Sequence, residues 1–493
     1  MSHTLATVRR DGRRPSASAL GDGSCIMLSH EEAFMDASTY AARRNALRTA
    51  VPEGAILIMG NAEAPRNYVE NPYPFRQDSH FLYYGGISQA GLALLIEADG
   101  SEVLYGTPEH SDDVIWFGPH ATLEDHAVAA GIASTADIGG LADRLGKLGD
   151  EGMVIHFLPP YRAERSFTVA RLLGIDPHEV EARTSIDLVR AVNAQRSIKE
   201  GAEIAEIEAA LAVTARMYEA TMRNAEAGRT EAEIAAVHQA VAIARDRRQA
   251  FEPIVTVCGD VLHNTSYANT LEDGDLLLVD SGAESPLHYA SDITRTMPVS
   301  GKFTSQQRDI YEVVLAANEA AINAAAPGVS NRELHLLAAR TIASGLKDIG
   351  IMKGNVDKAV EAGAHALFFV HGLGHMMGLD VHDMEDLGDI VGYPEGEERS
   401  TQFGLAFLRM ARKLEPGFVI TIEPGIYFIA ALIERWQGEG MHRSFIRYDK
   451  LEDYCGLGGV RIEDNVLITE DGSKVLGPGI PKTVDDVEAA MAR

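Results

Sequence analysis

The sequence predicts two folded domains, an α/β domain on the amino-terminal side followed by a larger α+β domain. Between about residues 40 and 185, the apolar runs GAILIMG, GLALLIEADG, SEVLYG and MVIHFLPP predict strands between helical stretches. From residue 198 onward, Ile207, Leu211 and Tyr218 recur on one face of a long helix. We therefore expect domains at 36–190 and 191–493, after a disordered lead-in over residues 1–35.

An internal repeat supports two related units within the second domain. The segment LEDGDLLLVD ends on Asp280, and LEPGFVITIE ends on Glu423, so these two acids occupy equivalent positions. Upstream, EAGRTEAEI (226–234) resembles APGVSNREL (326–334), and each contains a glycine and a capping box before an amphipathic helix. The shared order of motifs predicts two helix-and-strand units, each giving two carboxylates to one centre.

The composition argues against some classes of function. The chain has 493 residues, of which 46% are hydrophobic and 24% charged, as in a globular protein with a large core. No run approaches the roughly 18 consecutive apolar residues of a membrane span. The formal net charge of −28 disfavours nucleic-acid binding, which depends on clustered cations. Three cysteines without a CxxC pair, and a polar amino terminus, favour a reducing compartment, and we expect the cytoplasm.

Five residues of metal-binding type stand at the ends of β-type apolar runs. A carboxylate in such a run faces the protein interior, where it is costly unless it is paired or binds a metal ion. Four carboxylates match the charge of two divalent cations, and a neutral imidazole adds no charge. Oxygen-rich ligands with one nitrogen favour Mn²⁺, with Fe²⁺, Co²⁺ or Zn²⁺ as alternatives. The predicted ligands are Asp280, Asp292, His375, Glu423 and Glu463.

Such a centre predicts hydrolysis. Two cations that share carboxylates lower the pKa of a water molecule from 15.7 to roughly 7, which supplies a nucleophile at neutral pH. The same cations polarise a carbonyl group, so an amide bond is the expected substrate. The alternative is a purely structural metal site, although such sites rarely use paired, acid-rich centres.

Three further histidines surround the predicted ligands. His371 precedes His375 in HGLGH, His382 follows in DVHD, and His263 stands in VLHNTS. Gly372 occupies the position of the glutamate in the HExxH zinc-peptidase motif, so that motif is absent. Neutral histidines beside a metal centre can contact a substrate carbonyl or move protons. This interpretation is favoured for His371 and His382, whereas a structural role for His263 stays equally open.

Two later segments interrupt the ligand motifs. Residues 385–412 and 430–456 are rich in glycine and charged residues. We expect both to form surface loops near the mouth of the site.

Taken together, the ligand motifs resemble the pita-bread metallopeptidases, and among them the Xaa-Pro peptidases aminopeptidase P and prolidase. The segments that carry this resemblance are VDSGAE (279–284), SDITRT (291–296), HGLGHMMGLDVHD (371–383), EPGIY (423–427) and GVRIEDN (459–465). The segments YPFRQDSHFLYYGGI and IWFGP are similar to the first domain of that family. The resemblance implies a catalytic domain of two αββ-type halves about a pseudo-twofold axis, in agreement with the repeat.

The resemblance also implies how the metal ions are shared among the ligands. Asp280 would bind one ion, whereas His375 and Glu423 would bind the other. Asp292 and Glu463 would bridge the two. Because all five positions are occupied, a pseudoenzyme and the metal-free relative creatinase are disfavoured.

Catalytic roles follow from the same resemblance. Glu423 would take a proton from the attacking water. His263, His371 and His382 would contact the substrate. Arg461 would orient carboxylate ligands, which a guanidinium does well.

The implied substrate is a peptide with proline at its second position. YPFRQDSHF and IWFG favour aminopeptidase P, with prolidase as the alternative. Arg399 is the candidate for holding a dipeptide carboxylate. Trp116 is the candidate for reaching the site of a neighbouring subunit, with ordinary core packing as the alternative. The resemblance implies a homodimer or a dimer-based tetramer.

Two other classes of function stay open. A hydroxide held between two metal ions also attacks phosphorus, so a phosphoester or organophosphate hydrolase is possible in chemical terms. A binding module that kept the fold is the other alternative, although the complete set of ligands argues against it.

Overall fold

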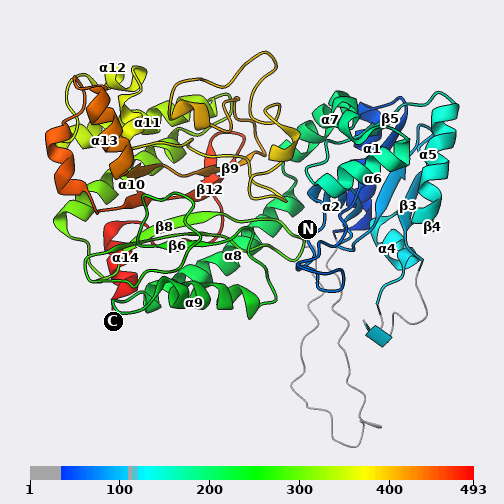
Figure 1. Cartoon of the computed structure of the whole chain (residues 1–493), viewed down its shortest axis with the longest axis horizontal. Coiled ribbons are helices and arrows are strands. Elements are labelled where there is room, and N and C mark those ends of the chain that lie inside the picture. The colour runs from blue at the N-terminus through cyan, green and yellow to red at the C-terminus, as the bar shows by residue number, and fades with distance from the viewer. Residues whose placement is uncertain (1–34, 109–114, 117, 119, 493) are drawn as a thin grey trace, which may run out of the picture.

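The computed structural model describes residues 35–108, 115–116, 118 and 120–492. The predicted lead-in over residues 1–35 lies, apart from Met35, outside this part of the chain. Figure 1 shows an α/β body with the amino-terminal elements beside a larger body that holds α8 to α14. No helix among the described residues has both the length and the apolar character needed to cross a membrane.

The amino-terminal body is built on a five-stranded mixed sheet with the order β4-β3-β2-β1-β5. The strands are β1 (Ala55–Met59), β2 (Ala93–Ile96), β3 (Glu102–Gly106), β4 (Ser134–Asp137) and β5 (Ile155–Phe157). β1 pairs antiparallel with β2 and parallel with β5, and β3 pairs parallel with β4. The four strands predicted from apolar runs are confirmed, whereas β4 has the polar sequence STAD and no such run.

Helices cover both faces of this sheet, because alternate strand residues point to opposite sides. Ile56 and Ile58 of β1 belong to a core with α1 and α2, whereas Ala55 and Leu57 belong to a second core with α5 and α6. The helices are α1 (Ala37–Ala50), α2 (Ser79–Gly85), α4 (Leu123–Ala130), α5 (Leu141–Asp150) and α6 (Ala163–Leu173).

Helix α7 (Ile186–Ser197) connects the two bodies. Its buried residues Leu188 and Val192 lie on either side of the predicted boundary at 190/191. The division of the chain at that point therefore stays a prediction.

Two pairs of helices open the larger body. They are α8 (Gly201–Asn224) with α9 (Glu231–Ile243), and α10 (Ser305–Ala324) with α11 (Asn331–Asp348). The predicted capping boxes are confirmed, with Thr230 and Ser330 as the caps of α9 and α11. α8 buries Ile207, Leu211 and Tyr218, as the helical periodicity predicts.

Short antiparallel strands lie between these helix pairs (Figure 1). Three-stranded sheets have the orders β6-β7-β8 and β13-β12-β9, and β10 pairs with β11. The strands are β6 (Ile254–Thr256), β7 (Leu276–Ser281), β8 (Ile293–Pro298), β9 (Val419–Ile422), β10 (Gly425–Tyr427), β11 (Gly459–Arg461), β12 (Asp464–Ile468) and β13 (Ser473–Val475). The pseudo-twofold relation between the halves stays a prediction.

Both segments predicted as surface loops contain 3₁₀ turns, and one also contains an α-helix. Residues 430–456 contain α13 (Ala430–Glu439), which buries Ile433 and Trp436, and the 3₁₀ segment Tyr448–Tyr454. The glycines in this region do not prevent a helix, because burial of an apolar face outweighs their weak propensity. Within the described residues, the other α-helices are α12 (Val356–Glu361) and α14 (Val484–Met491).

Candidate metal centre

Strand ends bring the five predicted metal ligands to one cavity. Asp280 lies on β7, Asp292 directly precedes β8, and Glu423 directly follows β9. Glu463 stands between β11 and β12, and His375 lies on the segment beside β9. All five line a cavity of about 530 Å³.

The ligand atoms lie close enough to share a cation. His375 Nε2 is 3.5 Å from Asp292 Oδ2 and 3.8 Å from Glu423 Oε1. Atoms of Asp292, His375 and Glu463 lie within 4.8 Å of one another. Within the described part of the chain, Oδ1 of Asp280 and Oδ1 of Asp292 are buried and lack a hydrogen-bond partner. Buried oxygens of this kind fit metal ligation, because an unpaired buried carboxylate oxygen is costly.

The electrostatics of the cavity also fit bound cations. Burial raises the pKa of the Asp292, Glu423 and Glu463 carboxyls well above the ordinary values, and neighbouring carboxylates raise it further. Several buried carboxylates cannot all be ionised without positive charge beside them. Divalent cations would supply that charge, so the residues present fit a metal centre.

His375 is held in the form that a metal ligand needs. Its Nδ1 donates a hydrogen bond of 3.0 Å to the carbonyl of Met376, which leaves the lone pair of Nε2 facing the carboxylates. Burial lowers the pKa of His375 to about 4, so the imidazole is neutral at neutral pH.

Arg461 orients the carboxylates of Asp280 and Glu463 through a network of hydrogen bonds. Its Nη2 donates to Asp280 Oδ2 at 2.6 Å, its Nε to Thr294 Oγ1 at 3.0 Å, and its Nη1 to the Tyr427 hydroxyl at 2.9 Å. Thr294 in turn donates to Glu463 Oε2 at 2.7 Å. One buried guanidinium therefore connects two predicted ligands, Asp280 directly and Glu463 through Thr294.

Two buried asparagines fix the backbone that carries the ligands. Asn318 of α10 donates to the carbonyls of Ile422 and Ile462, the residues before two ligand glutamates, at 3.0 and 3.3 Å. Asn465 accepts from the Asp292 N–H and donates to the Asp292 carbonyl. Neither asparagine was expected from the sequence, although a polar residue inside an apolar helix face, as at Asn318, indicates a buried polar role.

The three predicted histidines line the same cavity. His371 Nε2 is 2.8 Å from the Tyr427 hydroxyl, and the ring centroid of His382 is 4.1 Å from that of His375. Burial lowers the pKa of all three histidines, and that of His371 to about 3. Neutral rings can donate to or accept from a bound peptide, and His263 belongs to this group by position.

Comparison with known proteins agrees with this geometry. The model of metallopeptidase family M24 matches residues 205–470, and that of the aminopeptidase P N-terminal domain matches residues 40–155. The chain belongs to metallopeptidase family M24.

Relatives along nearly the whole chain specify the kind of M24 enzyme. The human Xaa-Pro dipeptidase is 30% identical, over 96% of this chain and 97% of its own length. A probable Xaa-Pro aminopeptidase of Sordaria macrospora is 32% identical, over 91% of this chain and 95% of its own length. A structure of Escherichia coli aminopeptidase P has a TM-score of 0.77 at 29% identity, covering 93% of this chain and 99% of that one. The predicted Xaa-Pro peptidase with a pita-bread fold is thus confirmed.

The wall of the cavity in this M24 peptidase is mainly apolar. Both segments predicted as loops contribute to it, in agreement with their expected place near the site. Arg409 is a cation on this wall, and its Nη1 donates to Glu385 Oε2 at 2.6 Å. The apolar members are Phe251, Ile254, Leu262, Val370, Val381, Phe403, Phe407, Ile429 and Leu432.

Arg399 does not line the cavity that the described residues form. Its Nε and Nη2 bind the Asp389 carboxylate at 2.8 and 2.7 Å. This position differs from the expectation for a residue that holds a substrate carboxylate. The short-range pair with Asp389 is the physical reason, since it satisfies the guanidinium outside the cavity.

Trp116 of the amino-terminal body is 79% exposed. Its side chain is therefore outside the core, which removes the core-packing alternative. A role in the site of a neighbouring subunit stays a prediction.

Proposed function

We propose that this M24 peptidase uses two divalent cations, Mn²⁺ above all, to cleave the Xaa-Pro bond of dipeptides. The observation that carries the preference for dipeptides is Arg409 on the cavity wall. A dipeptide places its carboxylate one residue beyond the cleaved bond, and a guanidinium is the side chain best suited to hold it. Arg461 is held by Asp280 and Tyr427, whereas Arg409 pairs with Glu385 through one nitrogen and lies on the cavity wall, where it can also bind a substrate carboxylate.

The second candidate is the aminopeptidase that the sequence motifs favour. The likeness to aminopeptidase P structures over 93% of the chain supports it. In that case Arg409 would stay paired with Glu385, and the peptide would continue past the proline.

The proposed chemistry divides among residues that are in place. When bound to the five ligands, divalent cations supply Lewis acidity and lower the pKa of water. Glu423 accepts a proton from the attacking water at its carboxylate and delivers it to the proline nitrogen, which must leave as an amine. His371 and His382 hold the substrate carbonyl and amine in line. Arg461 keeps Asp280 oriented throughout.

We also propose a homodimer or a dimer-based tetramer in the cytoplasm. Trp116 and Ile115, both more than two-thirds exposed, give the amino-terminal body an apolar surface suited to self-association. Cys258 and Cys455 are free thiols, which fits a reducing compartment.

Replacing Arg409 tests the choice between dipeptides and longer peptides. After chelation and reloading with Mn²⁺, we expect Arg409→Met to lower kcat/KM for Ala-Pro about 100-fold, as loss of a charged hydrogen bond of 2–3 kcal/mol implies. Cleavage of Ala-Pro-Ala should change little. Arg399→Met is the matched control and should leave both rates unchanged.

Other outcomes have distinct meanings. Faster cleavage of Ala-Pro-Ala than of Ala-Pro, unaffected by Arg409→Met, would establish the aminopeptidase instead. Hydrolysis of a phosphotriester at a rate above either peptide would favour the phosphoester alternative.

A further inference from the structure

A second group of reactive side chains lies where the two bodies meet. Ser88 comes from the loop between α2 and β2, whereas Glu284 and His288 come from the segment between β7 and β8. All three line a cavity of about 670 Å³. None of the residues that line this cavity also lines the metal cavity, so the two are separate sites.

The three side chains form a continuous chain of hydrogen bonds. Ser88 Oγ is 3.0 Å from His288 Nε2, and His288 Nδ1 is 2.9 Å from Glu284 Oε2. A carboxylate only accepts, so Nδ1 carries the proton and Nε2 is free to accept from the serine hydroxyl. This is the order of nucleophile, base and orienting acid found in acyl-transfer triads on unrelated folds.

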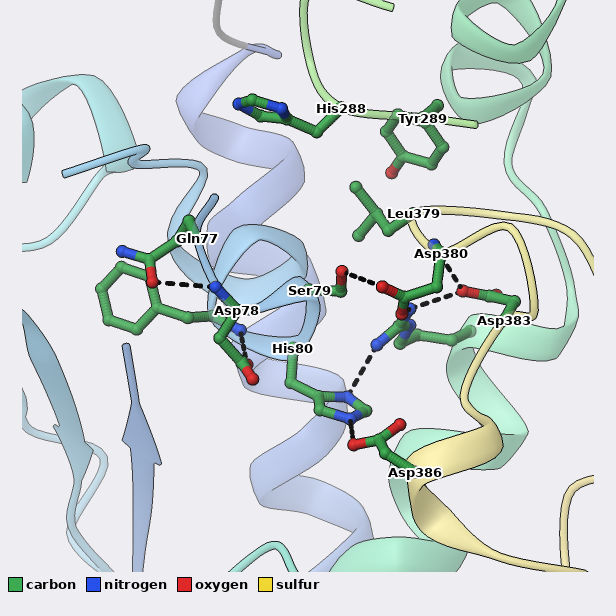
Figure 2. A network of polar contacts seen from close by, with 12 residues as sticks. Gln77, Asp78, Ser79, His80, His288, Tyr289, Leu379, Asp380, Asp383 and Asp386 are labelled. Carbon is green, nitrogen blue, oxygen red and sulfur yellow. Dashed lines mark hydrogen bonds and ion pairs between the residues drawn. The ribbon is translucent and has the colours of Figure 1, made fainter. Parts of the chain in front are cut away.

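The acid and the base are both held in place. Arg76 Nε donates to the other oxygen of Glu284 at 2.8 Å. Although burial acts in the opposite direction, Arg76 and His288 hold the pKa of Glu284 below its ordinary value. His288 has a φ of 66°, a left-handed conformation that few residues other than glycine adopt. Figure 2 shows His288 next to Tyr289, and separately the polar contacts in which Ser79 donates to Asp380.

The cavity is suited to an anionic ligand. Four arginines line it: Arg43, Arg245, Arg247 and Arg248. Arg43 is 2% exposed and already pairs with Glu200 and Glu203 at 3.0 and 3.5 Å, so Arg245, Arg247 and Arg248 are the arginines left to bind an anion. The acids Asp246 and Glu284 also line the cavity, and Glu284 is paired with Arg76. Such a cluster is notable in a chain with a net charge of −28.

We propose that Ser88, His288 and Glu284 form a second hydrolytic site, which cleaves carboxylic esters that carry an anionic group. This site needs no metal ion and is independent of the Xaa-Pro peptidase reaction. Esters are the fitting class, because an alcohol leaves a tetrahedral intermediate more readily than an amine does.

The reaction balances with water as the only co-reactant. Ser88 Oγ adds to the ester carbonyl carbon as its proton passes to His288 Nε2. The bond between the acyl carbon and the alcohol oxygen then breaks, and the leaving alcohol takes that proton. Water next adds to the acyl carbon with His288 as base, the bond to Ser88 Oγ breaks, and Oγ regains a proton. The products are an alcohol and a carboxylic acid.

The test separates this site from the metal centre by chelation. In EDTA we expect the full-length protein to hydrolyse 4-nitrophenyl hemisuccinate faster than 4-nitrophenyl acetate. Ser88→Ala and His288→Asn should each lower that rate at least about 100-fold, the contribution expected of a positioned nucleophile and base. Asparagine is chosen at position 288 because it tolerates the left-handed backbone. Ser79→Ala, which removes another interdomain serine without a histidine partner, should keep the rate.

A covalent probe gives a second readout. A fluorophosphonate should label Ser88 in EDTA, as found by peptide mass spectrometry, and should not label this peptide in His288→Asn. Metal-dependent cleavage of Ala-Pro should be unchanged in Ser88→Ala. Ester hydrolysis that persists in Ser88→Ala, or absence of label on Ser88, would overturn the proposal. Equal loss of ester and Ala-Pro cleavage in Ser88→Ala would also overturn it, because it would indicate only a contact between the two bodies.

Discussion

At Asp292 the side chain and the backbone are held by different partners. Oδ2 lies 3.5 Å from His375 Nε2, Oδ1 is buried without a partner among the described residues, and Asn465 binds both the N–H and the carbonyl. A carboxylate fixed in this way offers its two oxygens in different directions. It is therefore suited to bridge two cations, whereas Oδ2 of Asp280 already accepts a hydrogen bond from Arg461.

Removing the Asp292 carboxylate, the proposed bridging ligand, should abolish metal binding. We expect Asp292→Ala to lose both cations together and to lower kcat for Ala-Pro at least about 1,000-fold, because neither ion then has its full set of ligands. Metal content by plasma mass spectrometry and the peptidase rate are the measurements. Asp389→Ala, which removes an exposed carboxylate outside the cavity, is the control. Two bound ions per chain in Asp292→Ala would show that Asp292 does not bridge them.

Arg461 is also predicted to act on the metal centre, through the side chains that it holds by hydrogen bonds. Arg461→Lys keeps the charge but cannot reach Asp280, Thr294 and Tyr427 at once. We expect metal affinity or kcat to fall about 10- to 100-fold, as for other residues behind metal ligands. Titration of the chelated protein with Mn²⁺ measures this, and wild-type affinity together with wild-type kcat would contradict the assigned role.

At the scale of elements, the segment before His375 must lie against β9. The Thr421 N–H donates to the His375 carbonyl at 2.9 Å, and the Glu423 N–H donates to the Leu373 carbonyl at 2.8 Å. A Cβ on Gly374 would lie 1.9 Å from the Thr421 carbonyl oxygen. This close approach holds His375 and Glu423, two predicted metal ligands from distant parts of the sequence, side by side.

Adding one methyl group at Gly374 should therefore disturb both stability and catalysis. We expect Gly374→Ala to lower the free energy of unfolding by about 1–3 kcal/mol, the usual cost of overpacking, and to abolish most peptidase activity. Urea denaturation and the Ala-Pro assay are the measurements. Gly438→Ala in α13 is the control, because no atom lies within 4 Å of its added Cβ and alanine favours a helix. Equal behaviour of the two variants would refute the packing argument.

For the whole molecule, buried histidines link stability to pH. Burial lowers the pKa of His238 and His365 to about 4 and that of His335 to about 3. In the unfolded chain these rings bind a proton below about pH 6.5. Between that pH and about 4 the unfolded state holds more protons than the folded state, so stability falls as the pH falls.

Replacing one of these histidines should make the free energy of unfolding depend less steeply on pH. At pH 5 an unprotonated buried ring such as His335 costs about 2 kcal/mol relative to neutral pH. We expect His335→Leu to flatten the loss of unfolding free energy between pH 7 and pH 5 by about that amount, measured by urea denaturation in EDTA. His178→Leu, at an exposed position, should leave the slope unchanged. An unaltered slope in His335→Leu would contradict a depressed pKa at this site.

The acids and the histidine that meet in the cavity, and the presence of two folded bodies, could be predicted from the sequence because they depend on local patterns. An acid at the end of an apolar run, as at Asp280 or Glu423, faces the interior wherever that strand is buried. Capping boxes and the periodicity of α8 are equally local, since their partners stand three or four residues apart. The polar strand β4 could not be predicted in this way, because pairing with its neighbouring strand, and not its own sequence, places it in the sheet.

Which residues meet across long distances in the sequence was decided only by the tertiary structure. Arg399 and Arg409 stand ten residues apart in one charged segment, yet Asp389 holds the first outside the cavity while the second lines it. Other contacts likewise join separate elements. Asn318 donates to the backbone before Glu423 and Glu463, and Ser88 contacts His288. No spacing along the chain encodes such contacts, because they follow from how strands and helices pack, and that packing minimises the free energy of the whole molecule.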